Sequence, residues 1–170
     1  MIPNRLENAT VYGKGQRLYG IADVELPKFE YDADSFKPLG VAGELEVISP
    51  ANIKALSMKL KFRTVSEQSV ELLTPQTKEL EVYGAVSAYD PNQKQNVTKK
   101  VRVFAKVSPK SNSLGKVEAG KTMDTEVELS VQYFVLEIDG NKVVEYDPVG
   151  WVFAINGQNY LQDIKAALGL

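Results

Sequence analysis

The chain has 170 residues, the length of a single domain (residues 1–170), and a formal charge of −2. It contains no cysteine and no histidine, which excludes disulfides, thiolate nucleophiles, cysteine- or histidine-bound metals and Ser-His-Asp triads. We therefore expect no enzyme activity, cofactor or metal. Because the sequence shows neither a signal-like apolar core near residue 1 nor a bilayer-length apolar run, we also expect no secretory signal and no membrane anchor.

The first half of the chain predicts short strands. Residues 10–13 and 18–26 are extended segments separated by the turn signal Gly13-Lys14-Gly15. Residues 27–39 follow as a polar connection of about a dozen residues, which is long for a link between strands and suggests a functional loop. A strand at residues 45–48 precedes residues 55–63, where apolar and polar side chains alternate with the period of two that is typical of a strand.

A short helix and a hairpin are predicted next. Thr64 and Glu67 fit a capping box, which predicts a helix over about residues 65–74, bounded by Pro75. Two strands, at residues 80–89 and 98–107, then flank an Asp-Pro-Asn turn of the kind that joins antiparallel strands.

Residues 123–139 predict a strand that could reach roughly 55 Å at about 3.3 Å per residue. Polar and apolar side chains alternate up to Tyr133 and polar interruptions then nearly vanish, so either the strand becomes buried on both faces or a bulge shifts its phase. A turn at Asp139-Gly140 leads into residues 142–147. A second short helix is expected over about residues 160–168, with Asn159 as its cap and Gly169 after its end. The fold class is mainly β, an antiparallel barrel or sandwich with one or two short α-helices.

Charge is unevenly distributed along the chain. Residues 94–121 carry eight basic side chains and one acid, whereas residues 124–147 carry seven acids and one lysine. These blocks are interpreted either as solvated strand faces or as separate basic and acidic surfaces suited to head-to-tail self-association.

One segment matches a nucleotide-binding sequence motif but is not followed by the helix that this motif requires. Residues 115–122, Gly-Lys-Val-Glu-Ala-Gly-Lys-Thr, match the P-loop pattern G-x-x-x-x-G-K-[ST]. A phosphate-binding loop needs a helix after it, whereas the following residues have strand periodicity. We therefore predict a glycine-rich loop between strands. A P-loop nucleotide-binding enzyme and an isolated carbohydrate- or protein-binding β-sandwich remain the remote alternatives.

The ordered set of features along nearly the whole chain resembles the major tail tube protein family of contractile-tailed phages. The resemblance is strongest over residues 116–170, which carry Gly120-Lys121, Thr125-Glu126, the run from Tyr133 to Gly140, Val144-Glu145-Tyr146-Asp147 and Asn156-Gly157. It is poorest over residues 79–97.

The resemblance implies a β-barrel-like subunit that forms part of a larger inter-subunit barrel. It would assemble with itself into six-fold rings that stack into a hollow tube. DNA would be present only in transit. The further partners implied are sheath, tape-measure, baseplate and tail-terminator proteins, with assembly in the bacterial host cytoplasm and a final location in the virion tail. The inner tube of a phage-derived or type VI-like injection device is the related alternative.

Two sets of site residues follow from these interpretations. The polar side of the long strand is expected to face the lumen, through Glu126, Glu128, Ser130 and Gln132. The acidic and aromatic connection is expected to stack on the basic region of an adjacent ring, and the residues involved would be Phe29, Glu30, Tyr31, Asp32, Asp34 and Phe36 on one side and Lys100, Arg102 and Lys106 on the other.

Overall fold

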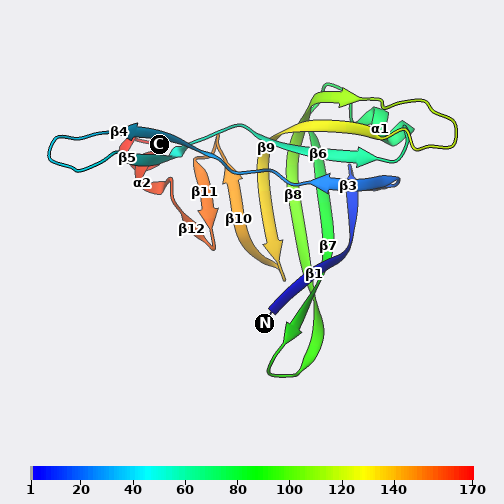
Figure 1. Cartoon of the computed structure of the whole chain (residues 1–170), viewed down its shortest axis with the longest axis horizontal. Helices are drawn as coiled ribbons and strands as arrows, with labels where there is room; N and C mark the ends of the chain where they lie inside the picture. The colour runs from blue at the N-terminus through cyan, green and yellow to red at the C-terminus, as the bar shows by residue number, and fades with distance from the viewer. Residues whose placement is uncertain (1) are drawn as a thin grey trace.

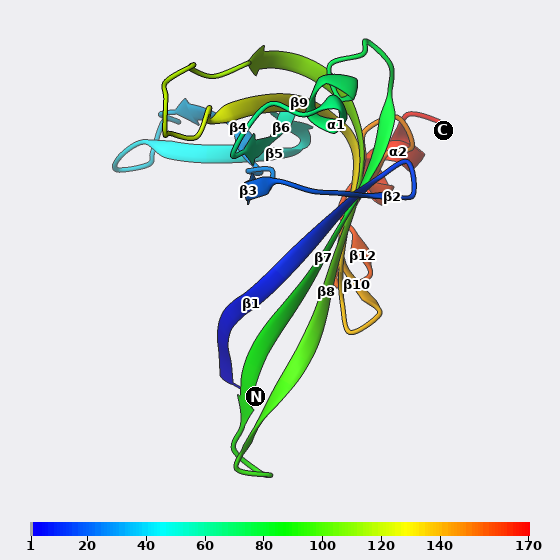
Figure 2. The same cartoon turned by 90° about the vertical axis from the view of Figure 1, so that its right-hand side faces the viewer.

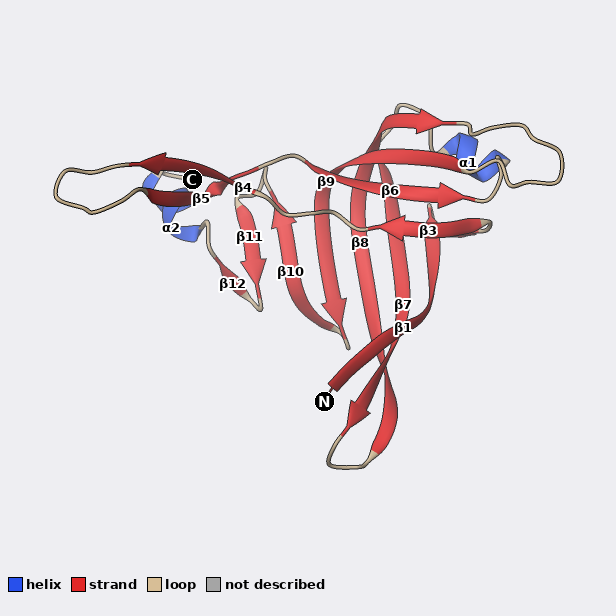
Figure 3. Cartoon of the chain, viewed as in Figure 1, coloured by secondary structure: helices blue, strands red, loops and turns tan. Residues whose placement is uncertain are grey.

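The computed structural model describes residues 2–170, which form an antiparallel, mainly β fold with two short helices (Figures 1 and 3). In chain order the elements are β1 (Ile2–Gly13), β2 (Gln16–Leu18), β3 (Ile21–Glu25), β4 (Tyr31–Phe36), β5 (Leu45–Ile53), β6 (Leu56–Phe62), α1 (Glu67–Glu71), β7 (Lys78–Asp90), β8 (Gln95–Ser113), β9 (Thr125–Ile138), β10 (Asn141–Asp147), β11 (Val152–Ile155), β12 (Gln158–Asn159) and α2 (Gln162–Ala167). The predicted fold class is confirmed, although the sheet of the single chain is not closed into a barrel.

Ten of the strands form one sheet that branches at β9. One edge of β9 pairs with β8, and beyond β8 follow β7, β1 and β2. The other edge is shared: the first half of β9 pairs with β6, which carries β3, and the second half pairs with β10, which carries β11 and β12. Figure 2 shows the consequence, because the lower parts of β1, β7 and β8 extend as an arm away from the region where β9 runs beside β6.

A β-bulge at Gln132 changes the direction of the side chains of β9. Lys106 of β8 pairs with Tyr133 and Val107 pairs with Val131, so Gln132 has no opposite residue on β8. Val131 is buried before the bulge and Phe134 is buried after it, although the two positions are three residues apart. Of the two interpretations of the long strand, the structure shows the phase shift, and because Phe134 and the adjacent Val135 are both buried it also shows burial on both faces just after the bulge.

The hydrophobic core lies on one face of this bent sheet. It combines side chains of β6, β7, β8 and β9 with Tyr146 of β10 and Phe153 of β11. On β6, all four apolar residues of the predicted alternation are buried, namely Leu56, Met58, Leu60 and Phe62. The opposite face of the sheet, which we call the polar face, is correspondingly free to carry charge.

Two predictions for the N-terminal half are wrong. Residues 27–39 are not an irregular connection, because Tyr31–Phe36 forms β4 and pairs with β5 in a separate two-stranded sheet. The first strand is also far longer than residues 10–13, since β1 begins at Ile2 and pairs with β7 along most of its length. Both segments are rich in polar residues because they are exposed, and exposure removes the apolar alternation by which a strand is recognised.

The helix caps differ from those expected. Ser66, not Thr64, begins α1: its side chain accepts a hydrogen bond from the backbone of Ser69, whose hydroxyl in turn accepts one from the backbone of Ser66. At α2, the Asn159 side chain accepts a hydrogen bond from the backbone N–H of Leu161 but lies in β12, and Leu161 is the N-cap residue. Gly169 follows the helix with φ +75°, as predicted.

Candidate functional site

On the polar face, the charged side chains of each strand form a column along that strand, and the sign of the charge alternates from one strand to the next. Across the sheet the strands follow the spatial order β7, β8, β9, β6 and β3. The charged residues of these columns are Glu79 and Glu81 on β7; Lys100, Arg102, Lys106 and Lys110 on β8; Glu126, Glu128 and Glu137 on β9; Lys59 and Lys61 on β6; and Asp23 and Glu25 on β3. Each basic column therefore lies between two acidic ones.

Beside β6, these columns are joined by ion pairs. The ammonium of Lys59 lies 3.3 Å from a carboxylate oxygen of Glu126. Lys61 pairs with Glu25 and, at 3.7 Å, with Asp23. These contacts follow from the register, because antiparallel pairing places β6 between β3 and β9 and sets residues of opposite charge on one face.

β8 supplies the partner of the second glutamate. Lys110 lies 3.0 Å from a carboxylate oxygen of Glu128, and the hydroxyl of Ser111 donates to the same carboxylate over 3.0 Å. The hydrogen bond from Lys110, followed by that from Ser111, lowers the pKa of Glu128 below its ordinary value. Glu128 is thus held in its charged form by two neighbours on β8.

Further along β8, Arg102 joins three strands. Its guanidinium lies 3.1 Å from Glu81 on β7 and 3.3 Å from Glu137 on β9. The hydroxyl of Tyr83 also donates to Glu81, and this bond, followed by that from Arg102, lowers the pKa of Glu81. Lys100 lies over the ring of Tyr83, 5.1 Å from its centroid.

A half-buried tyrosine continues the polar face toward β10. The hydroxyl of Tyr133 donates to Glu145 over 2.9 Å. Burial, followed by this hydrogen bond, raises the pKa of Tyr133 to about 12. Tyr133 therefore acts here as a neutral hydrogen-bond donor.

The predicted lumen residues and the predicted basic stacking residues lie on the same face. Glu126, Glu128 and Ser130 project from the first half of β9, with Gln132 at the bulge, whereas Lys100, Arg102 and Lys106 project from the neighbouring β8. For this face, the interpretation of separate basic and acidic surfaces is wrong. The physical reason is that residues 94–121 and 124–147 contribute adjacent antiparallel strands, so charges segregated along the sequence meet in space. Sequence reasoning missed Glu81 and Glu137, although the alternation of residues 55–63 had placed Lys59 and Lys61 on one side.

The predicted stacking segment divides into a packed part and an exposed part. The ring of Phe29 lies 5.7 Å from that of Phe134, 5.9 Å from Tyr146 and 5.8 Å from Phe153, measured between centroids. The Tyr31 ring lies 6.0 Å from Phe153. These two aromatic residues therefore anchor the hairpin to its own subunit.

The exposed part is the β4–β5 hairpin, which projects at one end of the molecule's long axis (Figure 1). Asp32 and Asp34 are exposed, and Glu30, just before β4, pairs with Lys28 at 2.9 Å. One side of the hairpin also bears three apolar side chains that remain about half exposed, namely Phe36, Leu45 and Val47. A two-stranded hairpin is at best marginally stable in water, so such a surface gains by burial against another molecule.

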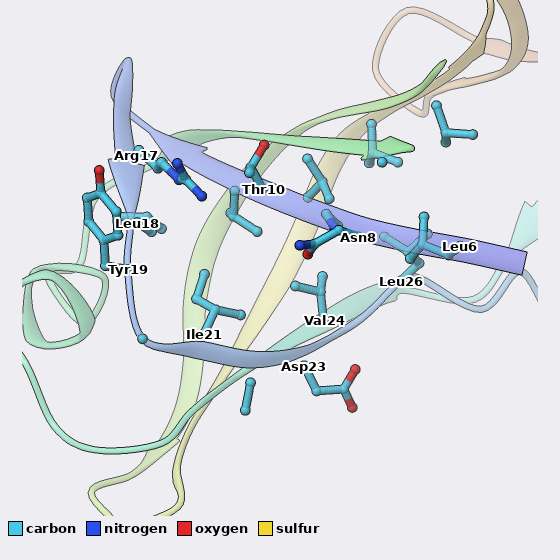
Figure 4. A pocket seen from close by; sticks show the side chains of 18 of the residues that line it. Leu6, Asn8, Thr10, Arg17, Leu18, Tyr19, Ile21, Asp23, Val24 and Leu26 are labelled. Atoms are coloured by element: carbon cyan, nitrogen blue, oxygen red, sulfur yellow. The ribbon is translucent and has the colours of Figure 1, made fainter. Parts of the chain in front are cut away.

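A cleft of about 500 Å³, lined by both apolar and polar side chains, separates β1 from β3 (Figure 4). β1 pairs with β7 on one side and with β2 only over Val11–Gly13, and β3 pairs only with β6 among the strands that the structure describes. Leu6 from β1 and Leu26 after β3 contribute to the lining and stay about half exposed. The two strand edges thus face each other without pairing, and the sheet is left open here.

Residues 114–124 form the loop between β8 and β9. The backbone N–H of Lys116 donates to the carbonyl of Met123 over 2.8 Å, and Lys121 pairs with Glu118 at 2.6 Å. A strand, not a helix, follows, so the prediction of a glycine-rich loop between strands is confirmed. The P-loop pattern here lacks the helix N-terminus that would hold a phosphate.

Neither a metal centre nor a bilayer-spanning helix is found within residues 2–170. No cluster of three or more acidic side chains in that range could hold a metal ion. No helix there has the length and apolar character needed to cross a membrane.

The comparisons with known proteins agree with this architecture. The family model described as phage tail tube protein FII matches residues 3–169. The tail tube protein of Escherichia phage P2 is 23% identical over 170 residues, covering 99% of both chains.

Two solved structures share the fold. One, from the sheath/tube terminator of the extracellular contractile injection system PVC in its extended state, has a TM-score of 0.54 at 11% identity and covers 81% of this chain and 98% of its own. The other, from the PVC sheath-tube complex in the extended state, has a TM-score of 0.52 at 11% identity and covers 76% of this chain and 88% of its own.

Proposed function

The chain belongs to the phage tail tube protein FII family, and from that premise we propose that it is the subunit of rings that stack into the hollow inner tube of a contractile tail. The rings are six-fold and DNA passes through their lumen. The subunit is a structural protein of the virion tail, and it assembles in the bacterial host cytoplasm.

The open sheet is the observation that carries this proposal. The edges of β1 and β3 face a cleft whose lining includes Leu6 and Leu26, and a neighbouring copy that covers this cleft would pair edges that one chain leaves free. Closure across subunits removes exposed edges and joins the separate sheets into one larger barrel. In that barrel the polar face, including Glu126 and Glu128, lines the water-filled lumen.

Contact between rings is assigned to the β4–β5 hairpin. Asp32, Asp34 and Phe36 present both charge and apolar surface at the end of the molecule, where they can reach an adjacent ring. Of the predicted basic partners, Lys100 takes part in no side-chain ion pair among residues 2–170, and its ammonium lies over the ring of Tyr83. Arg102 and Lys106 would first have to leave Glu81 and Glu79.

The remaining partners follow from the tube. A contractile tail requires a sheath around the tube, a tail terminator and a baseplate at its ends, and a tape-measure protein to set its length. The two similar PVC chains come from a sheath/tube terminator and from a sheath-tube complex, which supports the first two of these partners.

The test combines electron microscopy with light scattering of the purified protein. The wild type should form rings and, at high concentration, tubes. Asp32→Lys with Asp34→Lys should leave rings but shorten or abolish tubes, because repetition around a ring multiplies weak charge contacts. Glu67→Lys with Asp163→Lys makes the same charge change on the two exposed helix starts and should preserve tubes. A wild type that stays monomeric at every salt and protein concentration would contradict the proposed function.

A further inference from the structure

We propose that the carboxylates of β9, β3 and β7 form ion pairs that keep the basic groups of the polar face from binding phosphates. The polar face therefore does not retain a passing polyanion. The inference rests on the proposed function, in which the polar face lines the channel. It assigns a role to the ion pairs themselves, not to the net charge of the lumen.

The face would otherwise be adhesive. Apart from Lys100, which is assigned to the ring contact, its basic groups are Lys59, Lys61, Arg102, Lys106 and Lys110. Duplex DNA is bound mainly through basic side chains that neutralise phosphates and release counterions, and each such contact adds to the affinity. Because every ring would repeat the same residues, a moving duplex would meet this pattern at each step through the tube.

Carboxylates occupy most of these cations. Lys59 has Glu126 at 3.3 Å, Lys110 has Glu128 at 3.0 Å, and Lys61 has Asp23 at 3.7 Å as well as Glu25. The ion pairs are set by strand register, so each carboxylate acts at the high effective concentration of an intramolecular partner.

Arg102 is the most firmly held of the cations. It lies between Glu81 and Glu137, on the strands to either side of it, and Tyr83 fixes Glu81 by a further hydrogen bond. Guanidinium is the side chain best suited to bidentate phosphate contacts, and here its donors are already directed to carboxylates.

The carboxylates also repel phosphates that approach a basic side chain without an ion-pair partner. Neighbouring strands lie about 4.7–4.9 Å apart, so a phosphate approaching a lysine on β8 or β6 also approaches the carboxylates of β9. β9 is the key column because it lies between both basic ones, with Glu126 directed to β6 and Glu128 to β8.

The experiment measures binding of a fluorescent 30-base-pair duplex to the unassembled subunit by anisotropy. The wild type should show no saturable binding in 50 mM salt. Glu126→Gln with Glu128→Gln releases Lys59 and Lys110 and should bind, with a log–log salt slope of about −0.9 for each lysine that reaches a phosphate. Glu81→Gln with Glu137→Gln releases Arg102 and tests the same idea if the first variant does not fold.

The matched control is Asp32→Asn with Asp34→Asn, which changes the net charge equally but on the hairpin. It should bind no DNA. Equal binding by this control would show that net charge alone governs adhesion and would overturn the inference, as would a folded glutamine variant that fails to bind. Tube formation by the wild type is scored separately by electron microscopy. If the wild type forms tubes but the folded glutamine variants bind no DNA, only this inference is refuted. If the glutamine variants bind DNA but the wild type forms no tubes, only the proposed function is refuted.

Discussion

Gly115 shows how one residue closes the loop between β8 and β9. Its φ is +86°, and a Cβ added to it would lie 1.8 Å from the carbonyl oxygen of Met123. That carbonyl is the acceptor of the Lys116 N–H, so a side chain at position 115 would disrupt the hydrogen bond at the base of the loop. Gly120, in the same loop, also has a positive φ, but an added Cβ would meet open space.

We therefore predict that Gly115→Ala lowers the free energy of unfolding by more than the roughly 1–2 kcal/mol that a left-handed conformation costs an L-residue. Gly120→Ala should cost about that amount and no more, because it adds backbone strain without a clash. Thermal and urea unfolding of both variants would check this, and equal losses would contradict the assigned role of the Met123 carbonyl.

Phe29, just before the β4–β5 hairpin, and Phe36, at the end of β4, have different environments. Phe29 packs against Phe134, Tyr146 and Phe153, whereas Phe36 is 48% exposed. Phe29→Ala should lower the free energy of unfolding by about 2 kcal/mol, less than the full loss for a completely buried phenylalanine because Phe29 remains partly exposed. Phe36→Ala should leave unfolding nearly unchanged and shorten tubes. Urea unfolding and electron microscopy would measure the two effects, and a large stability loss from Phe36→Ala would contradict an interfacial role for it.

Elements were predictable from sequence where they bury one face. β6 and β9 contribute alternating residues to the core, so their periodicity is visible in the amino-acid sequence. β4 is exposed at almost every position, and its Tyr-Asp-Ala-Asp-Ser-Phe sequence has the composition of a loop. The polar face was only half predictable, since the alternation identifies which side chains share a face of one strand, but the pairing of β8 with β9 and β6 depends on distant parts of the chain.

At the scale of the whole molecule, the ion pairs of the polar face make stability depend on pH. Glu81 and Glu128 have pKa values lowered below the ordinary 4.5, so the folded state favours their charged forms more than the unfolded state does. Their contribution is complete above the unfolded pKa and is lost as pH falls through the lower folded values. The thermal midpoint should therefore decrease as pH falls from about 5 to about 3, and Glu81→Gln should flatten this decrease. A thermal midpoint independent of pH in this range would show that the pairs do not stabilise the subunit.

β1 pairs with β7 and β6 pairs with β9, and both pairings join distant parts of the sequence. This affects how the chain folds while it is being synthesised. Ile2 pairs with Tyr89, and Leu56 of β6 pairs with Val131 of β9. At a translation rate of about 5–20 residues per second, β1 emerges from the ribosome roughly 4 to 17 seconds before the far end of its partner. During the corresponding interval β6 can pair with β3, which is already made, but its four core residues lack the neighbouring side chains of β9. The nascent chain is thus most vulnerable to aggregation at β6 until the last third of the chain has been made.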